Sequence, residues 1–483
     1  MGLWTPGTGT SDRSLSWPSG TDWPASHENP ESGVQIPGFR NVAMTKTVAQ
    51  IVKPLVTALL NDAGPMPIQF WDGSFLGTPG ANVIMVKSPE ALRHILWAPG
   101  ELGLGRAYVA GEIDLEGSII ETLTAAQDMA GDSPDVVRQK LRARDVPTLI
   151  WTARKLGVLG FPPAPPPEEA RVRGGVHSKD RDAAAIAHHY DVSNDFYRLI
   201  LGETMTYSCA YFDSSTASLD EAQTVKYDLI CRKLGLVAGM RLLDVGCGWG
   251  SMAIHAASHY GVEVVGVTLS REQVELARER VAEAGLADLI EIRYQDYRDV
   301  GDGPYDAVSS IGMFEHVGSS RLEDYFTSIR EMLIPGGRFL NHAISRPSGS
   351  GPLPKRSFIA RYVFPDGELH EVGRVISSMQ ELGLEVRDVE SLREHYAKTL
   401  SHWVANLEGS WSDAVALAGP NRARIWRLYM AASVMNFKAN RASIHQVLAV
   451  NTPDSGKSEM PATRMGLSRS DNFDSTLGPG RRG

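Results

Sequence analysis

Cysteine is scarce in this chain of 483 residues, which contains only Cys209, Cys231 and Cys247. Three cysteines are too few for a disulfide framework, and their spacing matches no zinc-binding pattern. Such cysteine usage is typical of a reducing compartment, so the expected location is the cytoplasm. The chain also lacks the run of about 18 apolar residues that a membrane-spanning helix needs. Its first residues have neither the basic region nor the apolar core of a secretory signal.

A basic excess is missing too, because 48 Lys and Arg stand against 57 Asp and Glu, a formal net charge of −9. An acidic total argues against a general nucleic-acid binder, so no nucleic-acid partner is expected. Apolar residues make up 42% and charged residues 22%, which is ordinary for globular proteins. The composition therefore excludes collagen, complete disorder and a multi-span membrane protein.

Changes in composition divide the chain into five segments. Residues 1–40 and 451–483 are rich in Gly, Pro and Ser without an apolar period, which predicts disordered tails. Residues 41–160 mix helical and strand patterns and predict a small α+β domain. The Pro-rich residues 161–183 predict a linker. Residues 184–450 predict the larger domain.

Two segments, 136–156 and 422–441, interleave Arg and Lys with Trp, Leu and other apolar residues. This pattern is typical of helices that lie on an anionic lipid surface. Each segment also has an ordinary interpretation. The first fits a solvated helix packed on its own domain, and the second fits a core helix.

Within the larger domain, strand patterns at 240–246, 262–270, 290–296, 305–312 and 337–345 alternate with helical patterns. This alternation predicts a doubly wound α/β fold with a parallel sheet. The first strand contains Asp244 and runs into a glycine turn, GCGWG at 246–250, before a helix. Glycines let the backbone approach a ligand closely, and the helix N-terminus faces that ligand. The spacing is GxGxG, not the GxGxxG of dinucleotide-binding proteins.

This acidic strand end with its GxGxG turn resembles the class I methyltransferases, which have a Rossmann-like sheet and bind S-adenosylmethionine. One departure is that the second strand lacks the usual terminal acid, so Thr268, Ser270 and Gln273 would have to hold the ribose hydroxyls. The candidate cofactor-binding residues are Tyr207, Ser208, Asp244, Gly246, Cys247, Gly248, Gly250, Thr268, Ser270, Gln273, Gln295, Asp296 and Tyr297.

Five motifs, at 188–201, 204–212, 312–318, 339–345 and 395–403, together resemble the cyclopropane-fatty-acyl-phospholipid synthase and mycolic acid cyclopropane synthase family. The resemblance implies methylene addition across a cis double bond of an unsaturated acyl chain. Residues 41–160 are similar to the extra domain of the phospholipid-acting enzymes, which implies a phospholipid substrate. A cytoplasmic enzyme bound peripherally to the inner face of the membrane, and a homodimer, are expected on the same ground.

The resemblance also implies that a bound bicarbonate ion is the general base. The motif positions that would hold it are Cys209, Glu315, His342, the backbone of Ile344, and Tyr396. Each of these residues alone has an ordinary structural explanation, and it is their joint presence that favours the site. A carboxylate beside an anion repels it, so Glu315 is expected either to share a proton with the anion or to accept a hydrogen bond from the hydroxyl of bicarbonate. Aromatic faces suit a carbocation, and the candidates are Tyr190, Phe212, Phe314, Phe339 and Tyr362.

Three alternatives remain open at this point. The same methylation could lose a different proton and give a methylene-branched chain, the precursor of a 10-methyl fatty acid. The protein could methylate carbon in a small molecule, or it could be a silent lipid-binding protein on the same fold. The intact base set favours the cyclopropane product.

Overall fold

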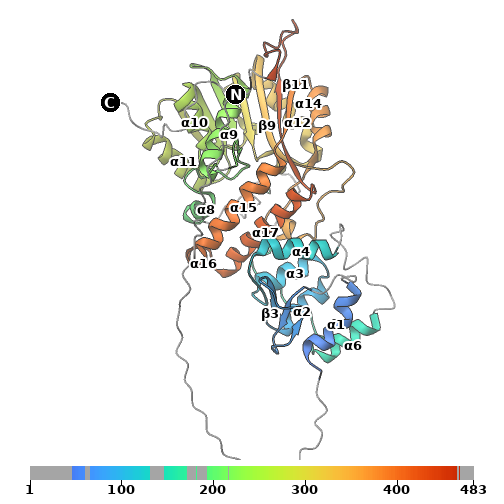
Figure 1. Cartoon of the computed structure of the whole chain (residues 1–483). Coiled ribbons are helices and arrows are strands. Elements are labelled where there is room, and N and C mark those ends of the chain that lie inside the picture. The colour runs from blue at the N-terminus through green and yellow to red at the C-terminus, as the bar shows by residue number, and fades with distance from the viewer. Residues whose placement is uncertain are drawn as a thin grey trace, which may run out of the picture. The chain divides into compact units, whose positions relative to one another are not determined.

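The computed structural model describes residues 46–59, 66–130, 146–170, 181, 193–215, 217–464 and 467 (Figure 1). The predicted tail at 1–40 and most of the predicted tail at 451–483 lie outside these residues. Among the described residues, no helix is both long enough and apolar enough to cross a bilayer.

The N-terminal part is built around a four-stranded sheet with the strand order β2-β1-β3-β4. Its α2 begins at Pro89, and the hydroxyl of Ser88 caps the helix by accepting a hydrogen bond from the Glu90 amide. The elements in chain order are α1 (Val48–Leu59), β1 (Ile68–Phe70), β2 (Phe75–Leu76), β3 (Val83–Val86), α2 (Pro89–Trp97), α3 (Glu101–Val109), β4 (Ile113–Glu116), α4 (Ile119–Ala130) and α6 (Val146–Lys155).

The C-terminal part contains an eight-stranded sheet with the order β11-β12-β9-β8-β5-β6-β7, and β10 pairs with β9 outside this path. The five strands predicted from the sequence are confirmed as β5 (Arg241–Val245), β6 (Glu263–Thr268), β7 (Ile290–Tyr294), β8 (Tyr305–Ile311) and β9 (Leu333–Arg346). They pair in parallel. The sequence did not predict β10 (His370–Glu371), β11 (Glu385–Ser391) or β12 (Ser443–Val450). Of these, β12 runs antiparallel to both β9 and β11.

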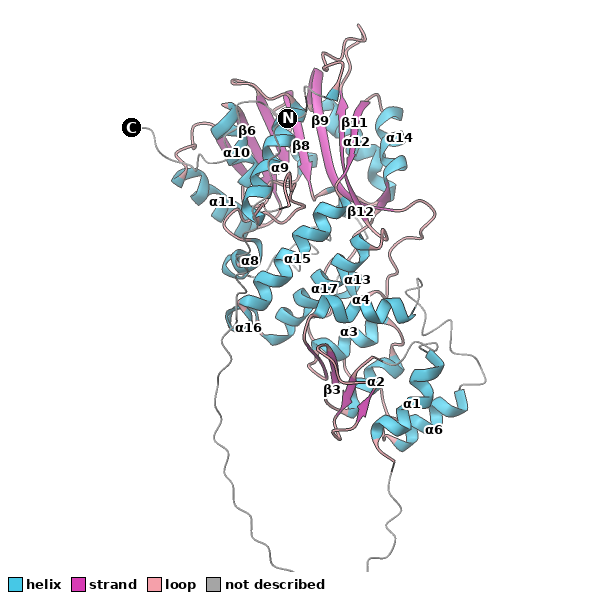
Figure 2. Cartoon of the chain, viewed as in Figure 1, coloured by secondary structure: helices cyan, strands magenta, loops and turns pink. Residues whose placement is uncertain are grey.

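Helices cover both faces of this sheet (Figure 2). Leu242 of β5 packs with α9 (Leu219–Leu234), α10 (Ser251–Tyr260) and α11 (Arg271–Glu283). The next residue, Leu243, packs on the opposite face with α12 (Leu322–Glu331) and α14 (Val372–Glu381). Successive side chains of a strand point to opposite faces, so a continuous apolar run is what a doubly covered parallel strand requires.

A helical layer connects the two sheets through α8 (Asn194–Leu201), α13 (Phe358–Tyr362), α15 (Arg393–Gly409), α16 (Trp411–Ala418) and α17 (Pro420–Lys438). Figure 1 shows α15 and α17 side by side, with α3 and α4 next to α17. Arg424 on α17 forms an ion pair of 2.8 Å with Asp114, and Arg427 donates a hydrogen bond of 3.1 Å to the Tyr108 hydroxyl. Because Ile425 and Trp426 are buried, the 422–441 segment is a core helix of the protein.

Parts of the predicted linker and C-terminal tail pack against the fold. Glu169, in the predicted linker 161–183, is buried and accepts hydrogen bonds of 2.9 Å from Arg106 and 3.2 Å from Tyr362. In the predicted tail 451–483, Leu467 is buried and its carbonyl accepts a bond of 3.0 Å from Arg232. Composition indicated irregular backbone in these segments but could not reveal such side-chain anchors.

Candidate active site

The glycine turn after β5 brings the backbone close to a pocket at the carboxyl edge of the parallel strands. Gly246 has φ +77°, and a Cβ placed there would lie 2.9 Å from Cβ of Met313. Only glycine fits this left-handed and crowded position without strain. The turn leads into α10 at Ser251. Ligands of open α/β sheets bind at this edge, where the strand order reverses between β5 and its neighbours.

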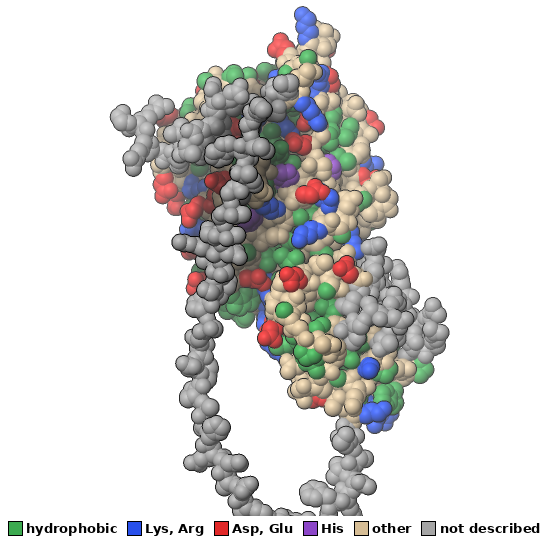
Figure 3. All heavy atoms as spheres, in the orientation of Figure 1, with side chains coloured by type: hydrophobic (Ala, Val, Ile, Leu, Met, Phe, Trp, Pro, Cys, Tyr) green, Lys and Arg blue, Asp and Glu red, His purple; other side chains and the backbone are tan. Residues whose placement is uncertain are grey.

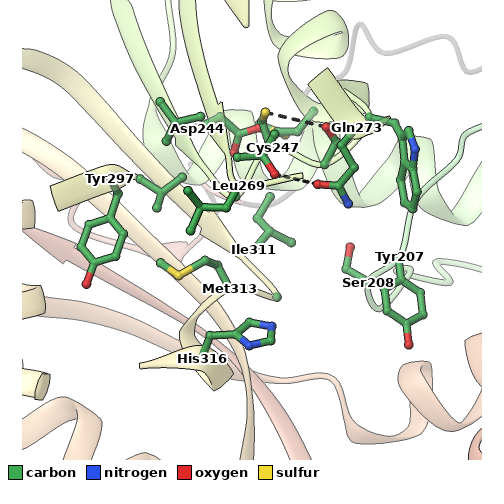
Figure 4. Close-up of a pocket in the computed structure, with 18 of the residues that line it drawn as sticks. Tyr207, Ser208, Asp244, Cys247, Leu269, Gln273, Tyr297, Ile311, Met313 and His316 are labelled. Carbon is green, nitrogen blue, oxygen red and sulfur yellow. Dashed lines mark hydrogen bonds between the residues drawn. The ribbon is translucent and has the colours of Figure 1, made fainter. Parts of the chain in front are cut away.

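The pocket beside this turn has a volume of about 150 Å³. Figure 4 shows Asp244, Cys247, Leu269 and Gln273 along one side and His316 on the other, with Tyr207 and Ser208 together on one flank. Every predicted cofactor-binding residue lines it except Gly250 and Ser270. Those two residues have structural roles. Gly250 begins α10 with φ 79°, and the Ser270 hydroxyl caps α11 by accepting a bond from the Gln273 amide.

The end of β6 carries neutral polar groups in place of an acid. The Thr268 hydroxyl donates a hydrogen bond of 2.7 Å to the Gln273 side-chain oxygen, and both residues line the pocket. The Gln273 amide NH2 group is thereby turned away from Thr268. After β7, the Asp296 carboxylate is held by Arg298 at 2.6 Å. These groups can bind ribose hydroxyls and adenine edges through hydrogen bonds.

Several pocket residues escaped the sequence analysis, among them Met205, Lys226, Trp249, Arg298, Met313 and Arg321. The position of Lys226 could have been inferred from the sequence pattern. It falls between Ala222 and Ile230 at steps of four residues on α9, in register with an apolar stripe. A lysine within such a stripe indicates a buried ammonium that needs a specific partner.

A second and larger cavity, of about 890 Å³, adjoins this pocket. Tyr207, Ser208, Gly312 and His316 line both of them. The cavity draws its walls from α2 and α3, from residues 342–369, and from α15 and α17. Its size is suited to a long apolar ligand. The shared residues mean that a group held in the first pocket can reach a chain held in the second.

Four of the five predicted base-site residues face the large cavity: Glu315, His342, Ile344 and Tyr396. Glu315 Oε1 accepts a hydrogen bond of 2.7 Å from the Ile344 amide, whereas its Oε2 is buried and has no hydrogen-bond partner among the described residues. The Ile344 amide is therefore used by Glu315. Cys209 is buried outside the cavity lining, and its thiol donates to the carbonyls of Ala210 and Leu392.

The proton of His342 can be placed from its neighbours. Lys233 donates to the side-chain oxygen of Gln446 at 2.9 Å, which fixes the amide orientation. The Gln446 NH2 group, 3.3 Å from His342 Nδ1, must then donate to that nitrogen. A neutral His342 ring therefore carries its proton on Nε2, an atom that is buried and without a hydrogen-bond partner.

Burial also sets the charge of these groups. Desolvation raises the pKa of Glu315 to about 7, although the Ile344 amide works in the opposite direction. Desolvation, together with the charge of Lys226, lowers the pKa of His342 well below its usual value. Burial raises the pKa of the Cys209 thiol. Near neutral pH the site thus presents a neutral imidazole and a carboxyl group that is close to half protonated.

None of the described aromatic residues that were expected around a carbocation lines the large cavity. Tyr190 lies outside the described residues, and Phe212, Phe314, Phe339 and Tyr362 do not line the large cavity. Phe314 and Phe339 belong instead to the core beneath α12. The aromatic residues that do line the cavity are Trp97, Tyr207, Phe364, Tyr396, Tyr429 and Phe437. Which aromatic residues line the cavity depends on the packing of segments that are far apart in the sequence, and local motifs do not reveal that packing.

The strand order, the glycine turn and the adjoining pocket define the class: this is a class I methyltransferase that uses S-adenosylmethionine. A solved mycolic acid cyclopropane synthase, complexed with SAH and CTAB, matches with a TM-score of 0.53 and 35% identity, covering 56% of this chain and 98% of that one. A cyclopropane synthase from Mycobacterium tuberculosis matches with a TM-score of 0.54 and 32% identity, covering 57% of this chain and 100% of that one.

The family described as "Mycolic acid cyclopropane synthetase" matches residues 177–447, and the chain belongs to this family. A Mycobacterium tuberculosis protein named "Probable fatty acid methyltransferase" is 42% identical over 431 residues, 86% of this chain and 98% of that protein. The "Cyclopropane-fatty-acyl-phospholipid synthase" of Escherichia coli K12 is 33% identical over 368 residues, 76% of this chain and 87% of that protein. The chain is therefore an S-adenosylmethionine-dependent methyltransferase of lipid acyl chains.

Proposed function

We propose that the protein adds a methylene group across the cis double bond of unsaturated phospholipid acyl chains and so forms cyclopropane fatty acids. The observation that carries this proposal is the pair of unpartnered polar atoms, Glu315 Oε2 and His342 Nε2, buried at a large cavity beside the cofactor pocket. Buried polar atoms without partners are rare unless a ligand supplies the missing partner.

The reaction needs two events in one enclosed space. The alkene carbon forms a bond to the sulfonium methyl while the carbon–sulfur bond breaks, which leaves a carbocation on the chain. A proton is then lost from the new methyl group, and the electrons of that C–H bond close the ring. An acyl chain that fills the cavity would displace water that could trap the cation, and Tyr396, Tyr429 and Phe437, which line the cavity, can stabilise its charge.

Two atoms of the base site, Glu315 Oε2 and His342 Nε2, have no hydrogen-bond partner among the described residues, and they fit a small anion such as bicarbonate. His342 Nε2–H, the Tyr396 hydroxyl and the protonated form of Glu315 can all donate hydrogen bonds. Bicarbonate bound there would supply a base for the proton of the new methyl group. In this arrangement Ile344 acts by fixing Glu315, and Cys209 acts by holding the backbone of residues 208–210 in place.

A phospholipid at a membrane surface is supported by the N-terminal part. Trp97, Glu101 and Leu102 belong to that part and line the large cavity. On α6, within the predicted lipid-binding segment 136–156, Ile150 and Trp151 are exposed next to basic residues, and residues 136–145 lie outside the described part. Figure 3 shows apolar and basic side chains together at the end of the molecule that carries α1 and α6. A homodimer remains a prediction.

The second candidate product is the methylene-branched chain. It is favoured by a Mycobacterium tuberculosis relative named "Tuberculostearic acid methyltransferase UfaA1", 34% identical over 396 residues, 79% of this chain and 87% of that protein. The two reactions share the first step and differ in which proton faces the base. A small-molecule C-methyltransferase would not need so large an apolar cavity.

Lipid analysis after expression in a host without such enzymes separates these candidates. Feeding methyl-labelled methionine labels the transferred carbon, and proton spectra of the extracted phospholipids identify the product. We expect high-field cyclopropane ring protons that carry the label. Vinylidene protons would establish the branched product instead, and unlabelled lipid would contradict the proposal. Glu315→Gln and His342→Gln are expected to abolish the signal.

Membrane association has its own test in co-sedimentation with vesicles that contain anionic phospholipid. Ile150→Glu on α6 is expected to reduce binding, because it places a negative charge on the exposed apolar face. Val237→Glu is the matched control, since Val237 is 57% exposed and Ile150 54% exposed. Equal loss of binding in both variants would contradict docking through α6.

A further inference from the structure

Two lysines of α9, Lys226 and Lys233, are buried but have very different partners. Lys233 forms ion pairs with Glu390 at 2.5 Å and Asp388 at 3.3 Å, and it donates to Gln446. Lys226 is 1% exposed and donates one hydrogen bond, of 2.9 Å, to the Ser208 hydroxyl. Among the described residues, no carboxylate forms an ion pair with it. The other contact of Lys226 is with the ring of Tyr227, whose centroid lies 4.4 Å from the ammonium nitrogen.

The charged groups near Lys226 do not offset the cost of its burial. Desolvation lowers the pKa of its ammonium to about 7, against the opposing influence of Cys209 and of Asp244 on β5. The charge of Lys226 also contributes to lowering the pKa of His255 on α10 and of His342 on β9. An uncompensated buried charge is costly, so such a lysine indicates a missing anion.

The same pocket contains a complementary buried carboxylate. Asp244 Oδ1 accepts a hydrogen bond of 2.7 Å from Ser309, whereas its Oδ2 is buried and has no hydrogen-bond partner in the part of the chain that the structure describes. Asp244, Lys226 and Ser208 all line the cofactor pocket. Asp244 and Lys226 do not form an ion pair with each other. A ligand that carries a carboxylate next to an ammonium, an α-amino acid zwitterion, would satisfy both groups.

We propose that Lys226, together with the hydroxyl of Ser208 that it contacts, binds the α-carboxylate of the methionine part of S-adenosylmethionine, opposite Asp244. Ser208 also lines the large cavity, so this anchor lies where the pocket meets the acyl chain. Holding the carboxylate there orients the sulfonium methyl toward the cavity. This inference rests on the proposed function, because it assigns a role within the same cofactor site.

The test compares two ligands of the full-length protein by calorimetry. S-adenosylhomocysteine has the amino-acid end, and 5′-methylthioadenosine lacks it. Lys226→Met is expected to lower the affinity for S-adenosylhomocysteine roughly ten- to hundredfold, the range for a lost hydrogen bond to a charged group. The affinity for 5′-methylthioadenosine should not change. Lys233→Met, on the same helix, is the control. It should lower the melting temperature without changing the ratio of the two affinities.

Equal weakening of both ligands by Lys226→Met would overturn the proposal and indicate a purely structural lysine. Unchanged binding of S-adenosylhomocysteine, with only the bicarbonate dependence of turnover altered, would overturn it too. If neither ligand binds the wild-type protein and no lipid is modified, the proposed function fails as well. If the wild-type protein binds both ligands and modifies lipid, but Lys226→Met changes the two affinities equally, only this inference fails.

A pH titration of the wild-type protein keeps the proposal testable if Lys226→Met does not fold. The pKa of Lys226 in the free protein is about 7. A bound carboxylate raises this pKa, so S-adenosylhomocysteine should bind more weakly as the pH of the solution rises from about 6.5 to about 8.5. The affinity for 5′-methylthioadenosine should stay constant over this range. A flat profile for S-adenosylhomocysteine would contradict the assignment.

Discussion

The cofactor pocket and the large cavity are built in opposite ways. The pocket takes its lining from short stretches within one part of the chain, residues 205–321, and many of them follow successive parallel strands. The cavity takes its lining from separate stretches at 97–102, 207–208, 312–316, 342–369, 396–400 and 429–444. Local patterns can therefore specify the pocket, whereas the cavity exists only after distant segments have packed.

Their electrostatic character differs as well. The pocket contains a buried basic group, Lys226, and a buried acidic group, Asp244, and burial lowers the pKa of the first to about 7 and raises that of the second to about 6. A ligand that carries both charges would favour the ionised form of each group. In the large cavity, burial favours the neutral forms of Glu315 and His342. An apolar chain can lie against neutral groups without the cost of desolvating a charge. The two compartments meet at Tyr207, Ser208, Gly312 and His316.

The largest expected effect separates the two compartments by function. Glu315→Gln removes a group of the base site, so product formation should fall by about 10²–10⁴-fold, the usual contribution of general base catalysis. Binding of S-adenosylhomocysteine should be unchanged, because Glu315 does not line the pocket. Turnover and calorimetry measure the two. The control is Glu385→Gln at the start of β11, and retained turnover in Glu315→Gln would contradict the site.

The second prediction concerns the pH dependence of stability. Burial raises the pKa of Glu315 from 4.5 to about 7, so the folded state holds a proton that the unfolded chain releases. This residue's contribution to the free energy of unfolding falls as pH rises from 4.5 to about 7. Glu315→Gln should remove that loss, on the order of 3 kcal/mol. Denaturant unfolding at pH 5 and pH 8 measures it.

The control for this pH effect has the opposite sign. Hydrogen bonds from Thr452 and Arg387 lower the pKa of the Glu385 carboxyl. Glu385→Gln should therefore remove a small stabilisation that is present at higher pH and lost as pH falls. An equal response of the two variants would show that Glu315 is not buried as described.

The third prediction tests the glycine turn. Gly246 and Gly248 both have positive φ, but only at Gly246 would a Cβ meet another side chain, at 2.9 Å from Met313. Both substitutions introduce a backbone strain of about 1–2 kcal/mol, but only Gly246→Ala would also clash with Met313. Gly246→Ala should therefore weaken the binding of S-adenosylhomocysteine by roughly tenfold more than Gly248→Ala does. Calorimetry measures the difference. Equal affinities would mean that the close approach at Gly246 is not required.

The smallest expected effect lies in the large cavity. Ser433 on α17 is 8% exposed and lines it. Ser433→Phe would fill part of the chain-binding space and raise KM for long acyl chains by roughly tenfold or less, with shorter chains affected less. Ser433→Ala is the control and should behave as the wild type. A uniform loss across chain lengths would indicate misfolding rather than narrowing.

The extent to which sequence predicted the structure follows the same division. The five strands and the glycine turn depend on local periodicity, and the structure confirms them. Glu315, His342 and Tyr396 were identified from motifs, and they do face one cavity. Cys209 and the four described aromatic residues that were expected there do not line it, because helix packing decides which side chains reach a cavity. The antiparallel strand β12 also escaped prediction, since its pairing with β9 spans about a hundred residues.

The central claim is that the cofactor and the acyl chain occupy adjoining compartments that meet at Tyr207, Ser208 and Gly312. A crystal structure with S-adenosylhomocysteine and a phospholipid that carries a cis double bond tests it most directly. The account predicts the sulfur at this junction, the chain in the large cavity, and the double bond facing the sulfur with room for one methyl group between them. A chain bound elsewhere, with the large cavity filled by protein side chains, would contradict it.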